Sequence, residues 1–247
     1  MNMPENGLFS ILDSVDSTNN YAMGIVHAGL AKHGMAWFAH EQTKGKGQRG
    51  KSWQSGKGEN IALSIVLVPK GLKAPEVFKI SVMVSLACTH FINGFVGSEV
   101  FIKWPNDIYW RDRKAGGILI ENVMQGGTWK YAVVGIGINV NQTSFSGGLK
   151  NPVSLKEITG KSFDIEALAK GLHKAVLLAV EEMGSKPFST FLAEYNHYLY
   201  KLNSTVKLKA ENKVFECIIN GVNERGKLLT SGASNKEFEF GQVEWII

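Results

Sequence analysis

Cysteine is scarce in this sequence: the chain of 247 residues has two, and no CxxC pair occurs. Cys88 lies in an apolar run and Cys217 in a strand-like one, so we expect two core thiols rather than a disulfide or a metal pair. The six histidines also lack metal-ligand spacing. The sequence therefore excludes a disulfide framework and predicts no metal site on protein ligands alone.

Long hydrophobic runs are absent as well. No stretch reaches the roughly 18 apolar residues needed to span a bilayer. The first residues also lack a basic start, an apolar core and a cleavage site. We therefore expect a cytoplasmic protein with no membrane partner. The net charge of +5 at pH 7 is typical of a mildly basic soluble protein, and charge alone does not separate it from one that binds a nucleotide or a nucleic acid.

Before residue 201 the apolar pattern predicts an α+β domain. Helical spacing follows the cap cluster Asp16–Asn19 and recurs at 76–95, 164–183 and 187–200. Strand-like segments lie at 35–42, 60–69, 99–104, 107–110, 115–123 and 129–140, with turns expected at Arg111-Asp112 and Gly126-Gly127.

From about Leu202 onward the sequence contains only short strand-like segments. They lie at 205–210, 213–221, 226–231, 237–241 and 243–247, and turn residues at Glu211-Asn212, Gly221, Arg225-Gly226 and Ser234-Asn235 separate them. Short strands at this spacing are typical of a small β-barrel or sandwich. We therefore place a boundary near Lys201, which divides the chain into units 1–201 and 202–247.

The loop Glu41–Trp53 contains three glycines and four cations and follows a predicted strand. Glycine lets a backbone approach a ligand closely, and cations neutralise phosphate. The spacing is not that of a Walker loop. Taken alone, the loop is equally consistent with a flexible basic surface segment that touches nucleic acid.

The segment Lys103–Ile108 brings a cation, an indole, an amide and a carboxylate together at the end of a strand. Pro105 ends that strand. The amide of Asn106 can bond a nucleobase or phosphate, and the carboxylate of Asp107 can bind Mg²⁺ or accept a proton. A structural Asn–Asp pair at a hairpin entry is the alternative.

Two glycine-containing strands complete the candidate chemistry. Lys114 precedes Gly116 and Gly117 at the start of one, although most lysines at strand starts are simply solvated. Gly135 and Gly137 leave one face of the other strand bare. Either a flat ligand or close packing of the protein itself would suit that face.

Together these segments resemble the biotin protein ligase family. The order of blocks is Asp16–Asn19, the glycine-rich loop ending at Trp53, KWPND at 103–107, Lys114 before GGILIE, and GIGINVN at 135–141. The resemblance covers nearly the whole chain. It implies a class II synthetase-like mixed β-sheet flanked by helices, followed by a small C-terminal SH3-like β-barrel, which agrees with the pattern above.

The resemblance also implies the reaction and the site. ATP activates biotin to biotinyl-5′-AMP, and the biotin then passes to a lysine of a biotin carboxyl carrier protein. The implied biotin-binding residues are Ser17, Thr18, Asn19, Gln42, Lys46, Gly47, Gln48, Lys114 and Gly116. The implied nucleotide-binding residues are Lys46, Arg49, Trp53, Asn106, Lys114 and Asn139. Lys114, Asp107 and Lys46 are the implied catalytic residues, with Asp107 as the candidate base, and Mg²⁺ is expected through the phosphates with Asp107 as a candidate ligand.

The loop departs from the usual family pattern at two positions. The family reads GRGR, where this chain has Lys46 and Gln48 in place of the arginines. Lysine keeps the charge without the bidentate fork, and glutamine loses the charge altogether. Retention of the adenylate is therefore expected to be weaker, unless Lys44, Arg49 and Lys51 compensate.

Some members of the family carry an N-terminal helix-turn-helix domain that represses transcription. Only about 15 residues precede Asp16–Asn19, which is too few for such a module. We therefore expect no DNA partner and no repressor role, and a homodimer is left open. The alternatives are a lipoate protein ligase, whose motifs lack the pairing of this loop with KWPND, and a nucleic-acid-binding protein that uses the basic loop and the C-terminal strands.

Overall fold

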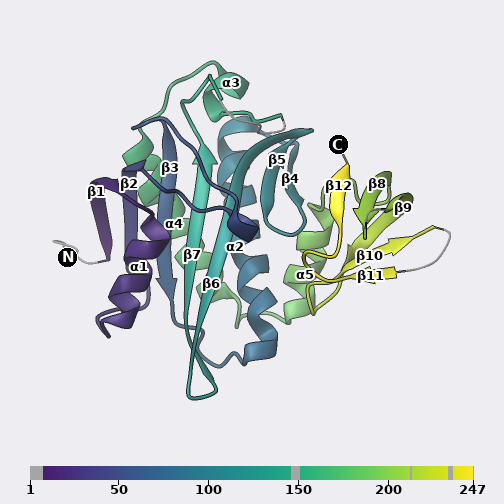
Figure 1. The fold of residues 1–247 in the computed structure, drawn as a ribbon, viewed down its shortest axis with the longest axis horizontal. Coiled ribbons are helices and arrows are strands. Elements are labelled where there is room, and N and C mark those ends of the chain that lie inside the picture. Colours follow the sequence, from purple (N-terminus) through teal and green to yellow (C-terminus); the bar gives the residue numbers. More distant parts are fainter. Residues whose placement is uncertain (1–7, 146–150, 212, 233–235, 247) are drawn as a thin grey trace.

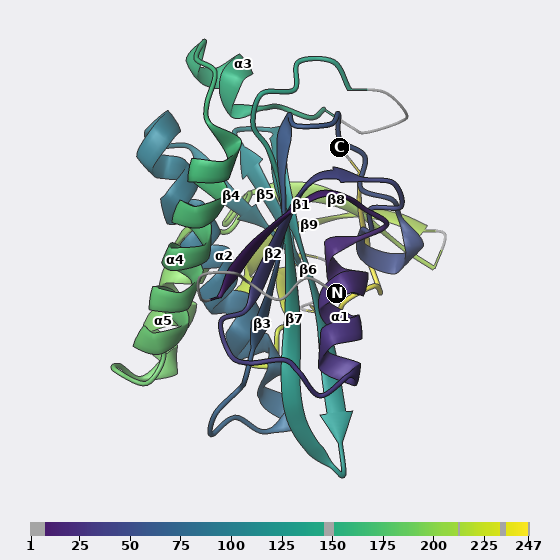
Figure 2. The ribbon, with the colours of Figure 1, turned by 90° about the vertical axis from the view of Figure 1, so that its left-hand side faces the viewer.

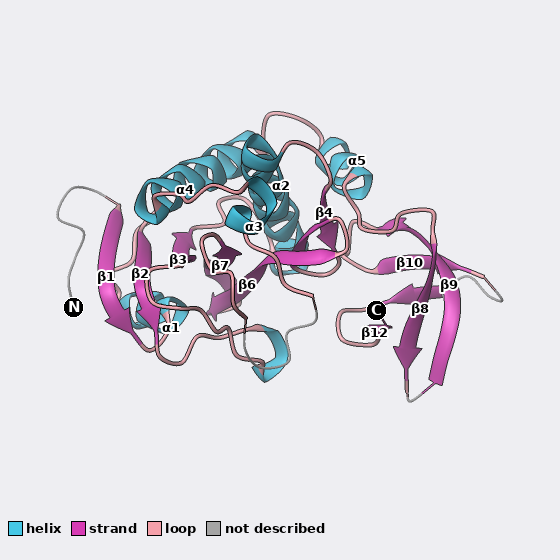
Figure 3. Ribbon diagram, turned by 90° about the horizontal axis from the view of Figure 1, so that it is seen from above, coloured by secondary structure: helices cyan, strands magenta, loops and turns pink. Residues whose placement is uncertain are grey.

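A computed structural model describes residues 8–145, 151–211, 213–232 and 236–246 (Figure 1). Its strands form two separate sheets, one of seven strands and one of five. The larger sheet carries the helices, and the smaller one stands beside it at the C-terminal end of the chain (Figures 1 and 3). The expected order of an α+β unit followed by an all-β unit is confirmed.

The seven-stranded sheet is mixed, as predicted. Its order is β1-β2-β3-β7-β6-β5-β4, with β1 parallel to β2 and the other neighbours antiparallel. The strands are β1 (Phe9–Val15), β2 (Ala36–Gln42), β3 (Asn60–Leu67), β4 (Val100–Lys103), β5 (Asp107–Trp110), β6 (Arg113–Gln125) and β7 (Thr128–Asn139). Every residue of β3 is buried, so this strand lies at the centre of the core.

Helices cover the two faces of this sheet unequally. Figure 2 shows α1 (Thr18–His27) on one face, with α2 (Val77–Val96), α4 (Ile165–Glu182) and α5 (Phe188–His197) on the other. The main core lies under α2 and α4, and a smaller cluster around Trp37 packs under α1. The sparsely covered α1 face leaves room for the loop between β2 and β3, which crosses in front of β7 and β6 (Figure 1).

Helix α2 is unusually apolar. Length and composition alone would let Ala74–Val96 cross a membrane, although 61% of its most apolar window is buried inside the fold. Ten of its residues are buried, and eight of them belong to the main core. The helix is apolar because it is a core helix. Polar residues interrupt its apolar sequence, so it contains no continuous apolar run of membrane-spanning length.

The C-terminal unit is an antiparallel sheet of five short strands. Its order is β11-β10-β9-β8-β12, with β8 (Thr205–Ala210), β9 (Lys213–Val222), β10 (Leu228–Ser231), β11 (Lys236–Phe238) and β12 (Glu244–Ile246). No pairing joins β11 to β12 in the described ranges, so the sheet is open there. The turn predicted at Gly221 is wrong: this residue lies inside β9, with φ of 144°, next to a shift in the register with β10. The turn expected at Ser234-Asn235 lies outside the described residues, as does Asn212.

Each predicted helix and strand is present. The strand β1, the helix α3 (Leu155–Thr159) and two short 3-10 helices, η1 (Gln48–Gly50) and η2 (Ala74–Glu76), were not predicted. β1 is an edge strand in which Ser10 is the buried residue, so its sequence shows no apolar alternation. The helix α3 is too short for helical periodicity, although its Ser154–Glu157 capping box is visible in the sequence. Both cysteines are buried and free, as predicted.

Candidate active site

A cavity of about 940 Å³ opens on the α1 face of the large sheet. Its lining comes from α1, the β2–β3 loop, the central strands and the connection that leads into β12. With one exception it includes every residue named above for biotin, nucleotide or catalysis: Ser17, Thr18, Asn19, Gln42, Lys46, Gly47, Gln48, Arg49, Trp53, Asn106, Asp107, Lys114 and Asn139. The fold therefore brings together residues from across the sequence.

Gly116 is the exception. A Cβ on this residue would lie 2.7 Å from the Gly137 carbonyl oxygen, so Gly116 allows β6 and β7 to approach closely. The neighbouring Gly117 points the other way and lines the cavity, and a Cβ there would lie 3.6 Å from Lys114 Nζ. Gly117 rather than Gly116 therefore lines the cavity, because successive residues of a strand face opposite sides, and the binding role of Gly116 stays a prediction.

One end of the cavity is a network of buried polar side chains. The backbone N–H of Thr18 donates to Gln42 Oε1 at 2.8 Å, and the Thr18 hydroxyl lies 3.1 Å from the same oxygen. Ser64 Oγ lies 2.7 Å from Thr18 Oγ1 and 2.6 Å from Asn19 Oδ1. Ser64 was not predicted, because a serine inside a buried strand carries no signal in the sequence. The network holds these polar side chains in place at this end of the cavity.

Side chains of the protein occupy the space beside Gly135 and Gly137, the two alternate glycines of β7. A Cβ on Gly135 would overlap Asn19 Oδ1, and a Cβ on Gly137 would lie 2.5 Å from Trp53 Cε2. Of the two alternatives for this face of β7, a flat ligand or close packing, the structure shows close packing by side chains of the protein. Gly137 lets the Trp53 indole lie on the sheet, and this contact anchors the C-terminal end of the β2–β3 loop.

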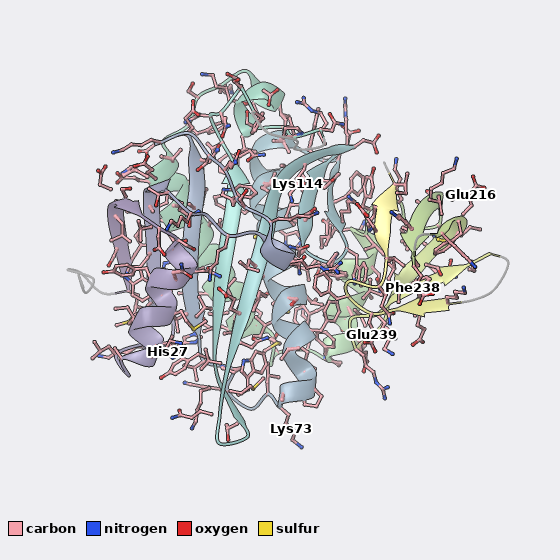
Figure 4. All side chains as sticks on the ribbon, viewed as in Figure 1. His27, Lys73, Lys114, Glu216, Phe238 and Glu239 are labelled. Atoms are coloured by element: carbon pink, nitrogen blue, oxygen red, sulfur yellow. The ribbon has the colours of Figure 1, made fainter. Side chains whose placement is uncertain are left out.

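The charged centre of the cavity is an ion pair between Lys114 and Asp107. Lys114 Nζ donates to Asp107 Oδ1 at 2.6 Å, and the two side chains are 24% and 23% exposed. The pair arises because Asp107 opens β5 opposite Gly117, three residues beyond Lys114 on β6. Lys114 lies at the upper end of β6 in Figure 4. Burial and the Asp107 charge raise the pKa of the neighbouring Tyr109, so its phenol stays protonated at neutral pH.

Two asparagines hold the backbone around this pair. Asn106 Nδ2 donates to the Ile118 carbonyl at 2.7 Å. Asn139 Nδ2 lies 3.2 Å from the Lys114 carbonyl and 3.1 Å from that of Val153. The two contacts of the Asn139 amide nitrogen use both of its N–H donors, whereas the contact with Ile118 uses one of the two donors of Asn106.

The β2–β3 loop is fastened at three places above the cavity. Lys46 forms a bridge with Ser52, and its ammonium lies 3.7 Å from Glu121 Oε1. Arg49 has φ of 56° and donates from Nη1 to the Gly241 carbonyl at 3.2 Å. Trp53 is the third anchor. The contact with Gly241 joins the loop to the C-terminal sheet.

The C-terminal sheet also lines the cavity directly, with residues that the sequence did not single out: Phe240, Gly241, Val243, Glu244 and Trp245. Trp245 Nε1 donates to the Trp104 carbonyl at 3.1 Å, and Trp104 Nε1 donates to the Gly226 carbonyl at 2.9 Å. These reciprocal bonds hold the two sheets together at the rim. In the part of the chain that is described, no three His, Cys, Asp or Glu side chains lie close enough to hold a metal ion.

The sequence matches the model of a known family. The model, described as the Biotin/lipoate A/B protein ligase family, matches residues 11–139, more than half of the chain. The chain belongs to this family. Of the blocks that suggested the resemblance, those from Asp16–Asn19 to Lys114 and GGILIE lie wholly within the match.

The similarity of this chain to two relatives extends beyond the residues that the family model matches. The Escherichia coli bifunctional ligase/repressor BirA is 29% identical over 227 residues, which cover 91% of this chain and 70% of BirA. The biotin–[acetyl-CoA-carboxylase] ligase of Paracoccus denitrificans is 28% identical over 234 residues, covering 92% of this chain and 95% of the relative.

A solved structure agrees with the fold of this family member as well. The biotin protein ligase from Aquifex aeolicus, in complex with biotin and ATP, superposes with a TM-score of 0.80 at 27% sequence identity. The superposition covers 96% of this chain and 98% of the other. Because nearly all of both chains is covered, the likeness includes the C-terminal strands.

Proposed function

We propose that this chain is a biotin protein ligase, which activates biotin with ATP and transfers it to a lysine of a biotin carboxyl carrier domain. One observation carries the proposal: a single cavity joins the polar pocket at Thr18 and Gln42 to the cation of Lys114, under a glycine-rich loop. Family membership and the biotin–[acetyl-CoA-carboxylase] ligase of Paracoccus denitrificans support it.

In the first step a carboxylate oxygen of biotin attacks the α-phosphorus of ATP. The bond from that phosphorus to the bridging oxygen breaks, and pyrophosphate leaves with the electron pair. Negative charge gathers on the phosphate oxygens, which a fixed cation in a water-poor site stabilises. Lys114 is our candidate for this cation, and Lys46 on the loop would support it. Ser17, Thr18 and Gln42 would bind the ring system of biotin.

In the second step the acceptor amine attacks the carbonyl carbon of the mixed anhydride. The bond from carbon to the phosphate oxygen breaks, AMP leaves, and the new amide nitrogen loses a proton. Asp107 is our candidate for accepting that proton, because its carboxylate lines the cavity beside Lys114. Asn106 and Asn139 would face the nucleotide through their amide oxygens, and Trp53 would pack beside it.

Mg²⁺ would bind chiefly through the phosphates and would neutralise their charge. Asp107 and Glu244 are carboxylates of the cavity lining that could add to such a site. Because Asp107 already contacts Lys114, the residues fit a metal held mainly by the nucleotide.

The finer organisation of the chain is also part of the proposal. We place the catalytic unit at 1–201 and the second unit at 202–247, and we assign an SH3-like topology to the five short strands of the second. The protein is proposed to act in the cytoplasm. The lack of a DNA partner and the homodimer stay predictions.

A biotin-dependent exchange of pyrophosphate into ATP tests the proposal. Exchange is expected with biotin and not with lipoate, and it should be lost in Lys114→Ala. Exchange with lipoate alone would indicate a lipoate ligase, and tight RNA binding without exchange would indicate a nucleic-acid-binding protein.

The role of Asp107 has its own test. In Asp107→Ala, formation of the adenylate should survive better than transfer to the acceptor, because the base is needed in the second step. Measuring exchange and transfer on the same preparation separates the two. Equal loss of both steps would remove the assignment.

A further inference from the structure

A carboxylate outside the cavity joins its floor to the loop above it. On β6, Glu121 accepts a hydrogen bond from Asn19 Nδ2 at 2.8 Å through Oε2, while Oε1 lies 3.7 Å from Lys46 Nζ. Asn19 and Lys46 line the cavity, whereas Glu121 does not. Glu121 is therefore placed to act through residues that face the ligand.

The two ends of this bridge differ in how firmly they are fixed. Asn19 is 3% exposed, and it is also held by Ser64 and by the bare surface of Gly135. The Lys46 side chain is 43% exposed. The loop is held to the rest of the fold elsewhere, by the Arg49 side chain at Gly241 and the Trp53 indole at Gly137. What depends on Glu121 is therefore the direction of the Lys46 ammonium.

The surrounding charges leave Glu121 as the direct partner of that ammonium. Among the residues that the structure describes, Glu121 is the carboxylate within ion-pair distance of Lys46. The Lys46 charge also helps to lower the pKa of Asp16, although a hydrogen bond from Asn20 is the main cause of that shift. An ammonium has three donors, and at 3.7 Å the Glu121 carboxylate attracts the Lys46 ammonium as an ion pair, so its donors stay available to a ligand.

We propose that Glu121 is a positioning residue that directs Lys46 toward the cavity and so sets how long the acyl-adenylate is retained. The inference rests on the proposed function. A lysine held in one orientation before the ligand arrives loses less conformational entropy on binding. An arginine at this position would present a rigid fork of several donors, whereas Lys46 has one ammonium on a flexible side chain. The orientation that Glu121 provides therefore matters more for lysine than it would for arginine.

Glu121→Gln separates the two halves of the bridge. The amide retains an oxygen for Asn19, whereas the charge facing Lys46 is lost. In single-turnover assays without acceptor, we expect the adenylate to leave about fivefold faster, as for the loss of a half-exposed ion pair. The KM for biotin should rise by a similar factor, while kcat for pyrophosphate exchange changes little.

Three matched variants complete the design. In Lys46→Met, adding Glu121→Gln should have no further effect on release. Glu121→Asp keeps the charge and should recover part of the retention. Asp13→Asn removes a carboxylate from the exposed ion pair with Lys57, whose N–O distance is 3.0 Å, and should leave release unchanged.

Slower or unchanged release in Glu121→Gln, or an equal change in the Lys46→Met background, would overturn the proposal. A lower melting temperature with reduced kcat and unchanged KM would assign Glu121 a purely structural role and would overturn it too. Exchange by the wild-type protein is measured first. If the wild type shows no biotin-dependent exchange, the proposed function fails, whereas exchange without the Glu121 effect refutes this inference alone.

Discussion

Adding one methyl group at Gly137 should open the active site without unfolding the protein. The new Cβ would lie 2.5 Å from Trp53 Cε2 and 2.6 Å from Cζ2, about 1 Å inside ordinary contact. Overpacking of a rigid core costs about 1–3 kcal/mol. Here the obstructed atoms belong to a loop side chain, so the indole can move away from the sheet. The expected cost to stability is about 1 kcal/mol or less, which is a fall of about 2–4 °C in Tm for a chain of this size.

The larger effect of Gly137→Ala should be on the intermediate. Trp53 is one of three anchors of the loop, and its displacement exposes the adenylate to water. If the anchor is worth about 1.4 kcal/mol to the closed loop, release of the adenylate rises about tenfold. Single-turnover release without acceptor measures this, and calorimetry measures Tm.

Gly116→Ala is the matched control, since its Cβ would lie 2.7 Å from a backbone oxygen in the middle of the sheet. No side chain can move aside there, so the cost is expected near the upper end of about 1–3 kcal/mol, with a correspondingly larger fall in Tm. Wild-type retention in Gly137→Ala, or a fall in Tm equal to that of Gly116→Ala, would refute the reasoning.

Three further predictions concern charge. Gln48→Arg restores a cation beside the cavity and should slow release of the adenylate in the same assay, whereas unchanged release would show that the missing arginine is compensated. Lys114→Arg should lose most of the exchange activity while keeping Tm within a few degrees, because the planar fork changes the direction of the donor toward Asp107; a variant with wild-type exchange would contradict this. Hydrogen bonds from Lys201, chiefly, and Tyr200 lower the pKa of Asp112 from its usual value of 3.8. Because the folded pKa is depressed, this stabilisation is present above 3.8 and is lost as the pH falls through the folded pKa, so the Tm difference between wild type and Asp112→Asn should shrink with acidification. A Tm difference that does not change with pH would contradict it.

Sequence reasoning worked best where a pattern has a local physical cause. The strands from β2 to β7 and the helices α2 and α4 follow from apolar spacing alone. The motif residues were also predicted to gather, and one cavity contains almost all of them. Their chemical roles stay predictions, since side-chain placement does not establish binding.

The residues that sequence reasoning missed depend on contacts between distant segments. Ser64 matters because β3 brings it under Thr18, and nothing in IALSIVLV indicates that neighbour. Gly117 lines the cavity and Gly116 does not, because the face of β6 that each residue presents depends on the register with β7. Phe240 and Trp245 reach the cavity only through docking of the two sheets. A single sequence contains no signal for any of these arrangements.

The hydrogen bond from Arg49 to Gly241 has a consequence for the order in which the chain is made. The loop, the pocket at Gln42 and the lysine at 114 are all synthesised well before the strand β12 that follows Gly241. Until β11 and β12 emerge and dock, the cavity lacks part of its rim and the loop lacks one anchor. A growing chain on the ribosome can therefore fold its large sheet early, yet the rim of the cavity is complete only after β12 has been made.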